Sequence, residues 1–311
     1  MAKRPFTKRA GFYVPRELPE VPDHPVEATE RPYNGIIIPI AKALMKAQGI
    51  RLTVFGAENI PLQGPALLAV NHTGYYDFIF GGIAAHLRGR RLVRFMAKKE
   101  IFDAPVAGPL MRAMKHLPVD RSAGASSLVD AVERLRAGQL VGIFPEATIS
   151  RSFELKEFKN GAARIAAEAD APLIPMVIWG SQRIWTKGHP KRLGRTRTPV
   201  FIRIGEPVDP TGNPDEAIAR LKDAMQVLLD RVQDDYTRAY GPFPAGEFWI
   251  PAEDGGSAPT LIDADRIDAE AKAAKKARAE EKAAAKLDKR ADAKLGNARS
   301  FIDKVKEKLR R

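Results

Sequence analysis

The chain contains no cysteine among its 311 residues. This absence excludes disulfide bonds, thiolate zinc sites, iron–sulfur clusters and a cysteine nucleophile. Long apolar runs are also lacking, because no segment reaches the roughly 18 consecutive apolar residues that a membrane-spanning helix needs. The basic first residues are followed by no apolar stretch, so they do not predict a signal peptide. We therefore expect a cytoplasmic protein without a transmembrane span, able to rest on a membrane.

Positive charge is concentrated at the two ends of the chain. The formal net charge is +13, of which residues 265–311 carry +7, and residues 1–16 hold five basic residues and no acidic one. The body between them is close to neutral. This distribution favours a globular body with two basic ends that meet an anionic membrane surface, and it argues against a large nucleic-acid-binding face. We expect no nucleic-acid partner.

Short apolar runs alternate with helical patterns from Arg51 to about Arg238, within a predicted domain of residues 34–240. Runs of strand length are Ala66–Val70, Arg91–Ala97, Leu140–Phe144, Leu173–Trp179 and Val200–Ile204, and helical periodicity covers Ser127–Ala137, Gly161–Ala169 and Pro214–Asp235. Strands that alternate with helices are typical of α/β proteins. We predict a mixed, mostly parallel sheet flanked by helices.

The remaining segments differ in composition from this body. Residues 1–33 are basic and rich in proline and predict an irregular lead-in, and residues 34–48 predict an apolar helix, either an ordinary core helix or an interfacial anchor. Residues 241–264 predict a linker. Residues 265–311 form an Ala/Lys/Glu-rich tail, and its last part, 297–311, has a basic amphipathic pattern that suits an anionic bilayer, a partner groove or simply a solvated end.

Three polar clusters directly follow apolar runs. They begin at Asn71-His72, at Asp120-Arg121 and at Pro145-Glu146. The carboxyl ends of parallel strands form the ligand-binding edge of an open α/β sheet, so the three clusters are expected to converge on one pocket.

His72 is the best candidate for a catalytic base. Asp77 follows five residues later, so the two side chains meet if His72 lies in a turn and Asp77 begins the next helix. Asp77 would then hold one ring nitrogen and leave the other to act as a base; a purely structural histidine is the alternative. The sequence has no His-Glu-x-x-His, Walker-type or dinucleotide-binding motif, so it predicts no metal site and no nucleotide hydrolysis.

Together these clusters resemble the sequence blocks of the glycerolipid acyltransferase superfamily, specifically its 1-acylglycerol-3-phosphate acyltransferase branch. His72 and Asp77 match the HxxxxD block, and the resemblance spans about residues 51–210. The other matching blocks are Ala97–Phe102 with Pro118–Arg121, Phe144–Thr148 with Phe158–Ala163, and Pro172–Pro175. The order of the four blocks is a stronger signal than any one of them.

The resemblance implies that a fatty acyl group moves from acyl-CoA or acyl-carrier protein to the free hydroxyl of lysophosphatidic acid, giving phosphatidic acid. His72 would be the general base and Asp77 its orienting partner. The substrate-binding residues would be Asn71, Lys99, Arg121, Glu146, Ala147 and Thr148, with Lys99 and Arg121 on the phosphate. No cofactor is expected beyond the acyl donor, and no covalent acyl-enzyme is needed. The expected location is the cytoplasmic face of the cell membrane, as a peripheral protein.

Three positions depart from the family pattern. Ala147 and Lys115 replace glycines, and Ile149 stands where an arginine usually follows the threonine. Arg151, two residues further on, is a candidate to supply the missing charge. The departure at Ile149 keeps other acceptors open, such as glycerol 3-phosphate or a glycolipid. A non-catalytic lipid- or nucleic-acid-binding protein is the alternative from a different class.

Overall fold

Nine strands form one sheet in the part of the chain that the structure describes. The structure, a computed structural model, describes residues 5–120, 128–278, 280, 281 and 285. The strand order is β1-β2-β3-β9-β8-β4-β7-β5-β6, with antiparallel pairing only in β1–β2 and β8–β9. The bounds are β1 Phe6–Arg9, β2 Phe12–Pro15, β3 Arg51–Phe55, β4 Ala66–Val70, β5 Val93–Lys98, β6 Leu117–Val119, β7 Leu140–Ile143, β8 Leu173–Trp179 and β9 Pro199–Ile204. The predicted mixed, mostly parallel α/β sheet is confirmed.

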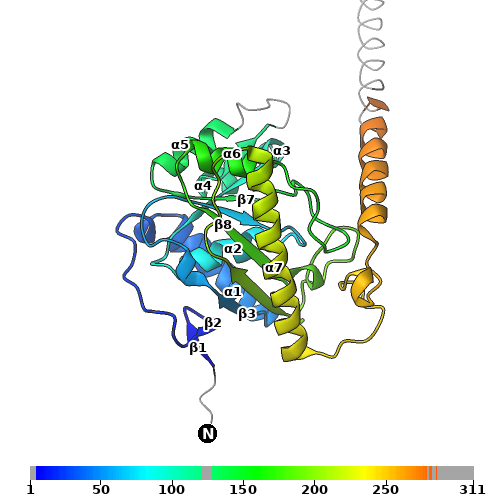
Figure 1. Ribbon diagram of the computed structural model, residues 1–311, viewed down its shortest axis with the longest axis horizontal. Coiled ribbons are helices and arrows are strands. Elements are labelled where there is room, and N and C mark those ends of the chain that lie inside the picture. Colours follow the sequence, from blue (N-terminus) through cyan, green and yellow to red (C-terminus); the bar gives the residue numbers. More distant parts are fainter. Residues whose placement is uncertain (1–4, 121–127, 279, 282–284, 286–311) are drawn as a thin grey trace, which may run out of the picture. The chain divides into compact units, whose positions relative to one another are not determined.

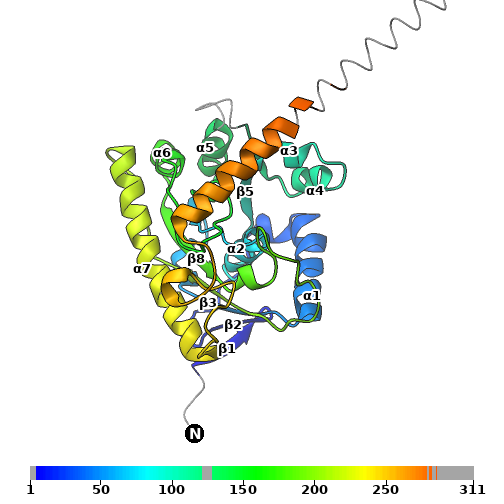
Figure 2. The same ribbon diagram turned by 90° about the vertical axis from the view of Figure 1, so that its right-hand side faces the viewer.

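Helices cover both faces of the sheet (Figures 1 and 2). The helices are α1 Ile38–Gln48, α2 Asp77–His86, α3 Lys99–Phe102, α4 Ala107–Ala113, α5 Val129–Arg136, α6 Gly161–Glu168 and α7 Pro214–Tyr240. Short turns of helix lie at η1 Glu27–Thr29, η2 Tyr33–Ile37, η3 Ala57–Asn59, η5 Ser181–Arg183 and η6 Ala252–Asp254.

The core is divided between the two faces because side chains alternate along each strand. On β4, Leu67 and Ala69 pack with α5, α6 and α7, whereas Leu68 and Val70 pack on the other face with α2. All five residues of β4 are buried. Such continuous apolar runs are typical of parallel strands covered by helices on both sides, which is why β4 and β8 were predicted with their correct bounds.

The predicted start of α7 is correct, whereas its predicted end is too early. The Asn213 side chain accepts a hydrogen bond from the backbone N–H of Asp215 at 2.8 Å, and Pro214 occupies the first turn. The helix continues to Tyr240, because Tyr236 is fully buried against the sheet and extends its apolar stripe.

The irregular lead-in predicted for residues 1–33 is wrong for residues 6–15, which form the β1–β2 hairpin. Ala10 and Gly11 both have positive φ at its turn. Phe12 and Val14 are buried, and β2 pairs in parallel with β3. The basic residues around the hairpin obscured this short alternation. The rest of the lead-in is tied to β5 by a largely buried ion pair, from Arg94 Nη2 to Glu30 Oε2 at 2.6 Å.

The helix predicted at 34–48 is present as η2 and α1, and it has two different faces. Met45 is buried, and Ile37 and Ile38 pack against a small apolar cluster. Ile36, Ile40 and Leu44 are exposed by 53%, 63% and 47%. The helix is thus partly a core helix and partly an exposed apolar stripe.

Residues beyond α7 fall into two parts. Phe243, Trp249 and Ala258 pack into the core, so the compact unit extends to Ala258 and the segment predicted as a linker is partly folded onto it. A second unit begins at Pro259 and is helical over residues 261–278, with Thr260 and Asp263 hydrogen-bonded at its start. The amphipathic pattern at 297–311 lies outside the described residues. Among the described helices, none combines the length and apolar character needed to span a bilayer.

Candidate active site

The first and third polar clusters are joined at one edge of the sheet, and the described part of the second, Asp120, follows another strand of that edge. The neighbouring strands β4, β7, β5 and β6 run parallel, so their carboxyl ends lie together. Asn71 and His72 follow β4, Phe144 and Glu146 follow β7, and Lys99 follows β5. Asp120 follows β6. Arg121 lies outside the described residues.

His72 and Asp77 form a hydrogen-bonded pair. His72 Nδ1 lies 3.0 Å from Asp77 Oδ2, with His72 in the turn after β4 and Asp77 as the first residue of α2. The Asp77 carboxylate is fully buried, while 21% of the His72 side chain is exposed. A carboxylate at Nδ1 favours the tautomer in which Nδ1 carries the proton, which leaves the lone pair on Nε2. The geometry is that of a base and its orienting acid.

The Asp77 carboxylate is held by donors from the turn and from a distant segment. The backbone N–H groups of Thr73 and Gly74 each donate to Oδ2 at 2.7 Å. The Ser181 hydroxyl, on η5 after β8, donates to Oδ1. Asp77 also lies in the first turn of α2, where the helix dipole favours negative charge. These interactions fix the orientation in which Asp77 meets His72.

The His72 ring and backbone are held independently of Asp77. The ring stacks on Phe144 with centroids 4.1 Å apart and planes at 22°. The His72 N–H donates to Glu146 Oε1 at 2.8 Å, and its carbonyl accepts from the Ser150 N–H at 2.7 Å. The turn after β4 is therefore clamped to the loop after β7.

Glu146 serves in this clamp, a role different from the expected contact with the acceptor. Its second oxygen accepts from the Lys156 N–H at 3.2 Å, and the side chain is buried. Burial raises the pKa of Glu146 to about 8, although the N–H donors of His72 and Lys156 oppose the shift. The Glu146 carboxyl group thus holds the backbone of His72 in place.

Asn71 is likewise turned away from the site. Its amide nitrogen donates to the Ile178 carbonyl at 3.1 Å, and its oxygen accepts from the Ile178 N–H at 2.7 Å. The side chain is buried and joins the end of β4 to β8. Its predicted contact with substrate is therefore replaced by a contact with the sheet.

The predicted basic and hydroxyl residues lie around the edge of the site. Lys99 is 58% exposed, with Nζ 3.5 Å from Asp120 Oδ2. Thr148 Oγ1 accepts from Lys187 Nζ at 3.2 Å. Arg151 is half-buried and its guanidinium approaches Gly188.

The two residues that replace family glycines both have a left-handed backbone conformation. Ala147 has φ of 60° and Lys115 has φ of 55°, conformations that glycine adopts without steric cost. The fold therefore keeps the backbone shape that the family pattern expects. Ile149 is different, because its side chain is only 5% exposed and contributes no charge where the pattern has arginine.

His116, which directly precedes β6, has a structural role. Its Nδ1 accepts from the Phe95 N–H at 3.0 Å, and burial together with nearby Arg94 lowers its pKa to about 3.

Sequence reasoning missed Ser181 and Lys187, which reach the site from the segment after β8. No local motif marks either residue, because their contacts join positions far apart in the chain.

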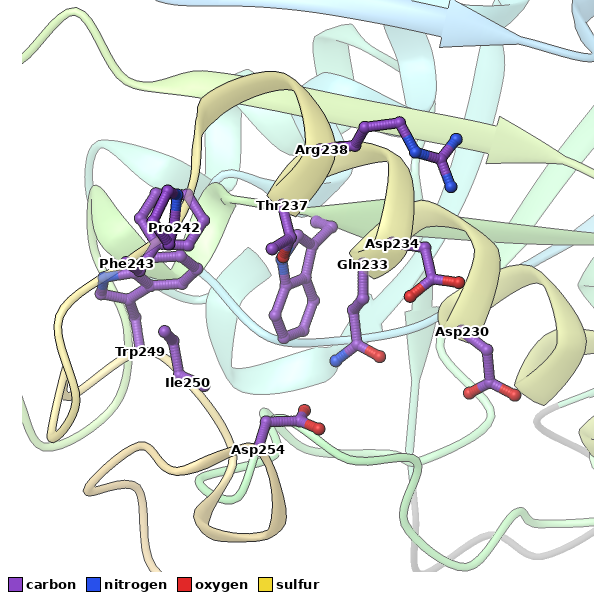
Figure 3. Close-up of a pocket in the computed structure, with 11 residues that line it drawn as sticks. Asp230, Gln233, Asp234, Thr237, Arg238, Pro242, Phe243, Trp249, Ile250 and Asp254 are labelled. Atoms are coloured by element: carbon purple, nitrogen blue, oxygen red, sulfur yellow. The ribbon is translucent and has the colours of Figure 1, made fainter.

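Figure 3 shows a hollow of about 780 Å³ elsewhere on the same unit, beside α7. Asp230, Asp234 and Asp254 lie toward one side, and the rings of Phe243 and Trp249 toward the other. It contains neither His72 nor Asp77. Burial and the neighbouring carboxylates raise the pKa of Asp254. Within the described residues, no group of three or more His, Cys, Asp or Glu side chains is arranged to hold a metal ion.

A base–acid pair at the carboxyl edge of a mostly parallel sheet defines a candidate acyl-transfer site, and comparison with known proteins gives the family. The family model described as Acyltransferase matches residues 51–179. A 1-acyl-sn-glycerol-3-phosphate acyltransferase of Bacillus subtilis is 31% identical over 171 residues, which is 54% of this chain and 78% of that protein. The chain belongs to the acyltransferase family, as an O-acyltransferase of the 1-acyl-sn-glycerol-3-phosphate acyltransferase branch.

Plant proteins and one solved structure are also similar. The Limnanthes douglasii 1-acyl-sn-glycerol-3-phosphate acyltransferase is 32% identical over 187 residues, covering 58% of this chain and 62% of that protein. The chloroplastic LPAT1 of Arabidopsis thaliana is 30% identical over 157 residues, covering 49% and 42%. The crystal structure of PlsC from Thermotoga maritima covers 70% of this chain and 87% of that one, with 24% identity and a TM-score of 0.49.

Proposed function

We propose that this protein transfers a fatty acyl group from a thioester to the free hydroxyl of lysophosphatidic acid, producing phosphatidic acid. The observation that carries the proposal is the His72–Asp77 pair, with Nδ1 bound to a buried carboxylate and the ring partly exposed. The names of the relatives support the same acceptor.

The proposed reaction is a single displacement. His72 Nε2 accepts the proton of the acceptor hydroxyl while the oxygen attacks the thioester carbonyl. The tetrahedral intermediate then collapses, the carbon–sulfur bond breaks, and the imidazolium returns the proton to the leaving thiolate. The acceptor hydroxyl takes the place that serine holds in a Ser-His-Asp triad, so no acyl-enzyme forms. The nearby Ser181 hydroxyl donates to Asp77 and is a positioning group.

The donor is proposed to be acyl-CoA or acyl-carrier protein, and no resident cofactor takes part. Glycerol 3-phosphate and glycolipids stay open as alternative acceptors because of one observation, the buried Ile149 in place of an arginine. The protein should be incubated with each donor and with each of the three acceptors, and the products identified by mass spectrometry. We expect phosphatidic acid from lysophosphatidic acid. Acylation of glycerol 3-phosphate or of the glycolipid alone would refute this acceptor.

We also propose that the protein works as a peripheral protein on an anionic membrane, at the cytoplasmic face. The support is the exposed stripe of Ile36, Ile40 and Leu44, spaced four residues apart on one helical face. Replacing the three with serine should weaken binding to vesicles that contain anionic lipid, measured by co-sedimentation. The double variant Ala43→Ser with Ala47→Ser, at exposed positions of the same helix, is the control for general surface changes. Equal loss in both variants would contradict a role for the stripe.

A further inference from the structure

The loop after β7 lacks a cation at the position where the family pattern has one. Ile149 occupies that position and is buried. Lys99, the other described candidate for a phosphate ligand, follows β5, which is separated from β4 by β7 in the sheet. A positive group nearer to the turn after β4 would lie closer to an acceptor whose hydroxyl reaches His72.

Two cations lie beside that turn, and one of them comes from a segment outside the recognised blocks. The Thr186 hydroxyl donates to the Thr73 carbonyl at 2.6 Å, next to His72. Lys187 Nζ then reaches the Thr148 hydroxyl at 3.2 Å. Arg151 approaches the same segment, since a Cβ built on Gly188 would lie 2.4 Å from its Nη1.

The segment that carries Lys187 is anchored and strongly basic. The Tyr75 N–H donates to the Trp185 carbonyl at 3.0 Å, and the two rings lie 4.5 Å apart. No acidic residue occurs between Asp170 and Glu206. Burial and the charge of Arg151 lower the pKa of His189, which shows that the Arg151 guanidinium lies close to this segment. The two cations are thus held in place before an anion arrives, which reduces the entropic cost of binding it.

We propose that Lys187 and Arg151 form the binding site for the phosphate monoester of the acyl acceptor, replacing the arginine that Ile149 displaces. This inference rests on the proposed function. Lys187 supplies a compact charge with three donors, and Arg151 supplies a planar fork that matches two phosphate oxygens. With the phosphate held there, the acceptor hydroxyl is directed toward His72. His72 lies two residues before the Gly74–Asp77 turn, which this segment contacts.

The test compares acceptors with and without a phosphate. Steady-state kinetics with acyl-CoA would be measured for Lys187→Ala, using lysophosphatidic acid and the monoacylglycerol of the same chain. A charge-assisted hydrogen bond is worth about 1.5–3 kcal/mol, so the KM for lysophosphatidic acid should rise by roughly 10- to 100-fold. The KM for monoacylglycerol should stay unchanged, and Lys187→Arg should restore much of the loss.

Arg195→Ala is the matched control. Arg195 lies on the same basic segment and is exposed, and the substitution removes the same charge. If Lys187→Ala and Arg195→Ala raised the KM for lysophosphatidic acid equally, the inference would be overturned while the proposed function stood.

A binding measurement separates failure of this inference from failure of the proposed function. Glycerol 3-phosphate would be titrated by calorimetry into His72→Ala and into His72→Ala with Lys187→Ala. Weaker binding by about 10-fold or more in the double variant supports the phosphate site, even if the wild type acylates another acceptor. Equal affinities overturn it.

Discussion

Replacing Ser181 with alanine would remove one of the donors that hold the Asp77 carboxylate. Ser181 is fully buried, its hydroxyl donates to Asp77 Oδ1, and the Thr73 hydroxyl lies 3.1 Å from it. A hydrogen bond to a charged group contributes about 1.5–3 kcal/mol, so the free energy of unfolding should fall by that amount. The remaining donors, His72 Nδ1 and the Thr73 and Gly74 N–H groups, bind only Oδ2.

The same change should lower the rate of acyl transfer. With Oδ1 unheld, the carboxylate is held through Oδ2 alone, and His72 loses part of its fixed orientation. A loss of about 1.4 kcal/mol of transition-state stabilisation corresponds to roughly a 10-fold lower kcat, with the KM for the acceptor unchanged because Ser181 contacts Asp77. The assays are urea unfolding and thiol release from acyl-CoA.

Ser152→Ala provides the control for this prediction. Ser152 is also fully buried, but its hydroxyl pairs with Ser150 at 3.2 Å and has no contact with Asp77. We expect Ser152→Ala to keep kcat near the wild-type value. If Ser181→Ala kept the wild-type kcat as well, the reasoning that Ser181 positions Asp77 would be refuted.

Two further predictions concern the loop after β7. Because burial raises the pKa of Glu146 from 4.5 to about 8, the folded state keeps a proton that the unfolded state gives up above its usual pKa, so stability should fall as pH rises from about 4.5 to about 8 and then level off. Glu146→Gln should flatten this fall in thermal unfolding between about pH 5 and pH 9, and parallel curves would contradict the assignment. Ala147→Gly should raise the free energy of unfolding by roughly 0.5–1 kcal/mol in urea, because φ is 60° there. Ala104→Gly, without a positive φ, should lower it; a loss of stability in both would argue against left-handed strain.

The parts of the fold that were predictable are those with continuous apolar runs. β4 and β8 are buried on both faces, so every residue in them is apolar or nearly so, and their bounds follow from composition. The β1–β2 hairpin was missed because only Phe12 and Val14 are buried in a segment full of charge. Its stability depends on pairing with β3, whose residues lie about 40 positions later. A local pattern does not reveal such a partner.

The candidate site, like the fold, was predictable from the sequence only in part. The pairing of His72 with Asp77 was accessible from a spacing of five residues and a turn before a helix. The hydroxyl of Ser181 reaches Asp77 across 104 positions, and Lys187 reaches Thr148 across 39. Asn71 matched a motif, yet its role changed because its partner is the backbone of Ile178 on a strand that is distant in sequence. Residue identity indicated the site, whereas tertiary contacts decided the roles.

The central claim is that His72 is the base of a one-step acyl transfer. The most direct measurement compares thiol release from acyl-CoA, with lysophosphatidic acid as acceptor, for the wild type and His72→Ala. General-base catalysis contributes about 100- to 10,000-fold, so His72→Ala should lose at least about 100-fold in kcat while unfolding at the same temperature as the wild type. Intact-protein mass spectrometry of the wild type with acyl-CoA alone should show no acylated enzyme. Full activity of a folded His72→Ala variant, or a stable acyl-enzyme on the pathway, would contradict the account.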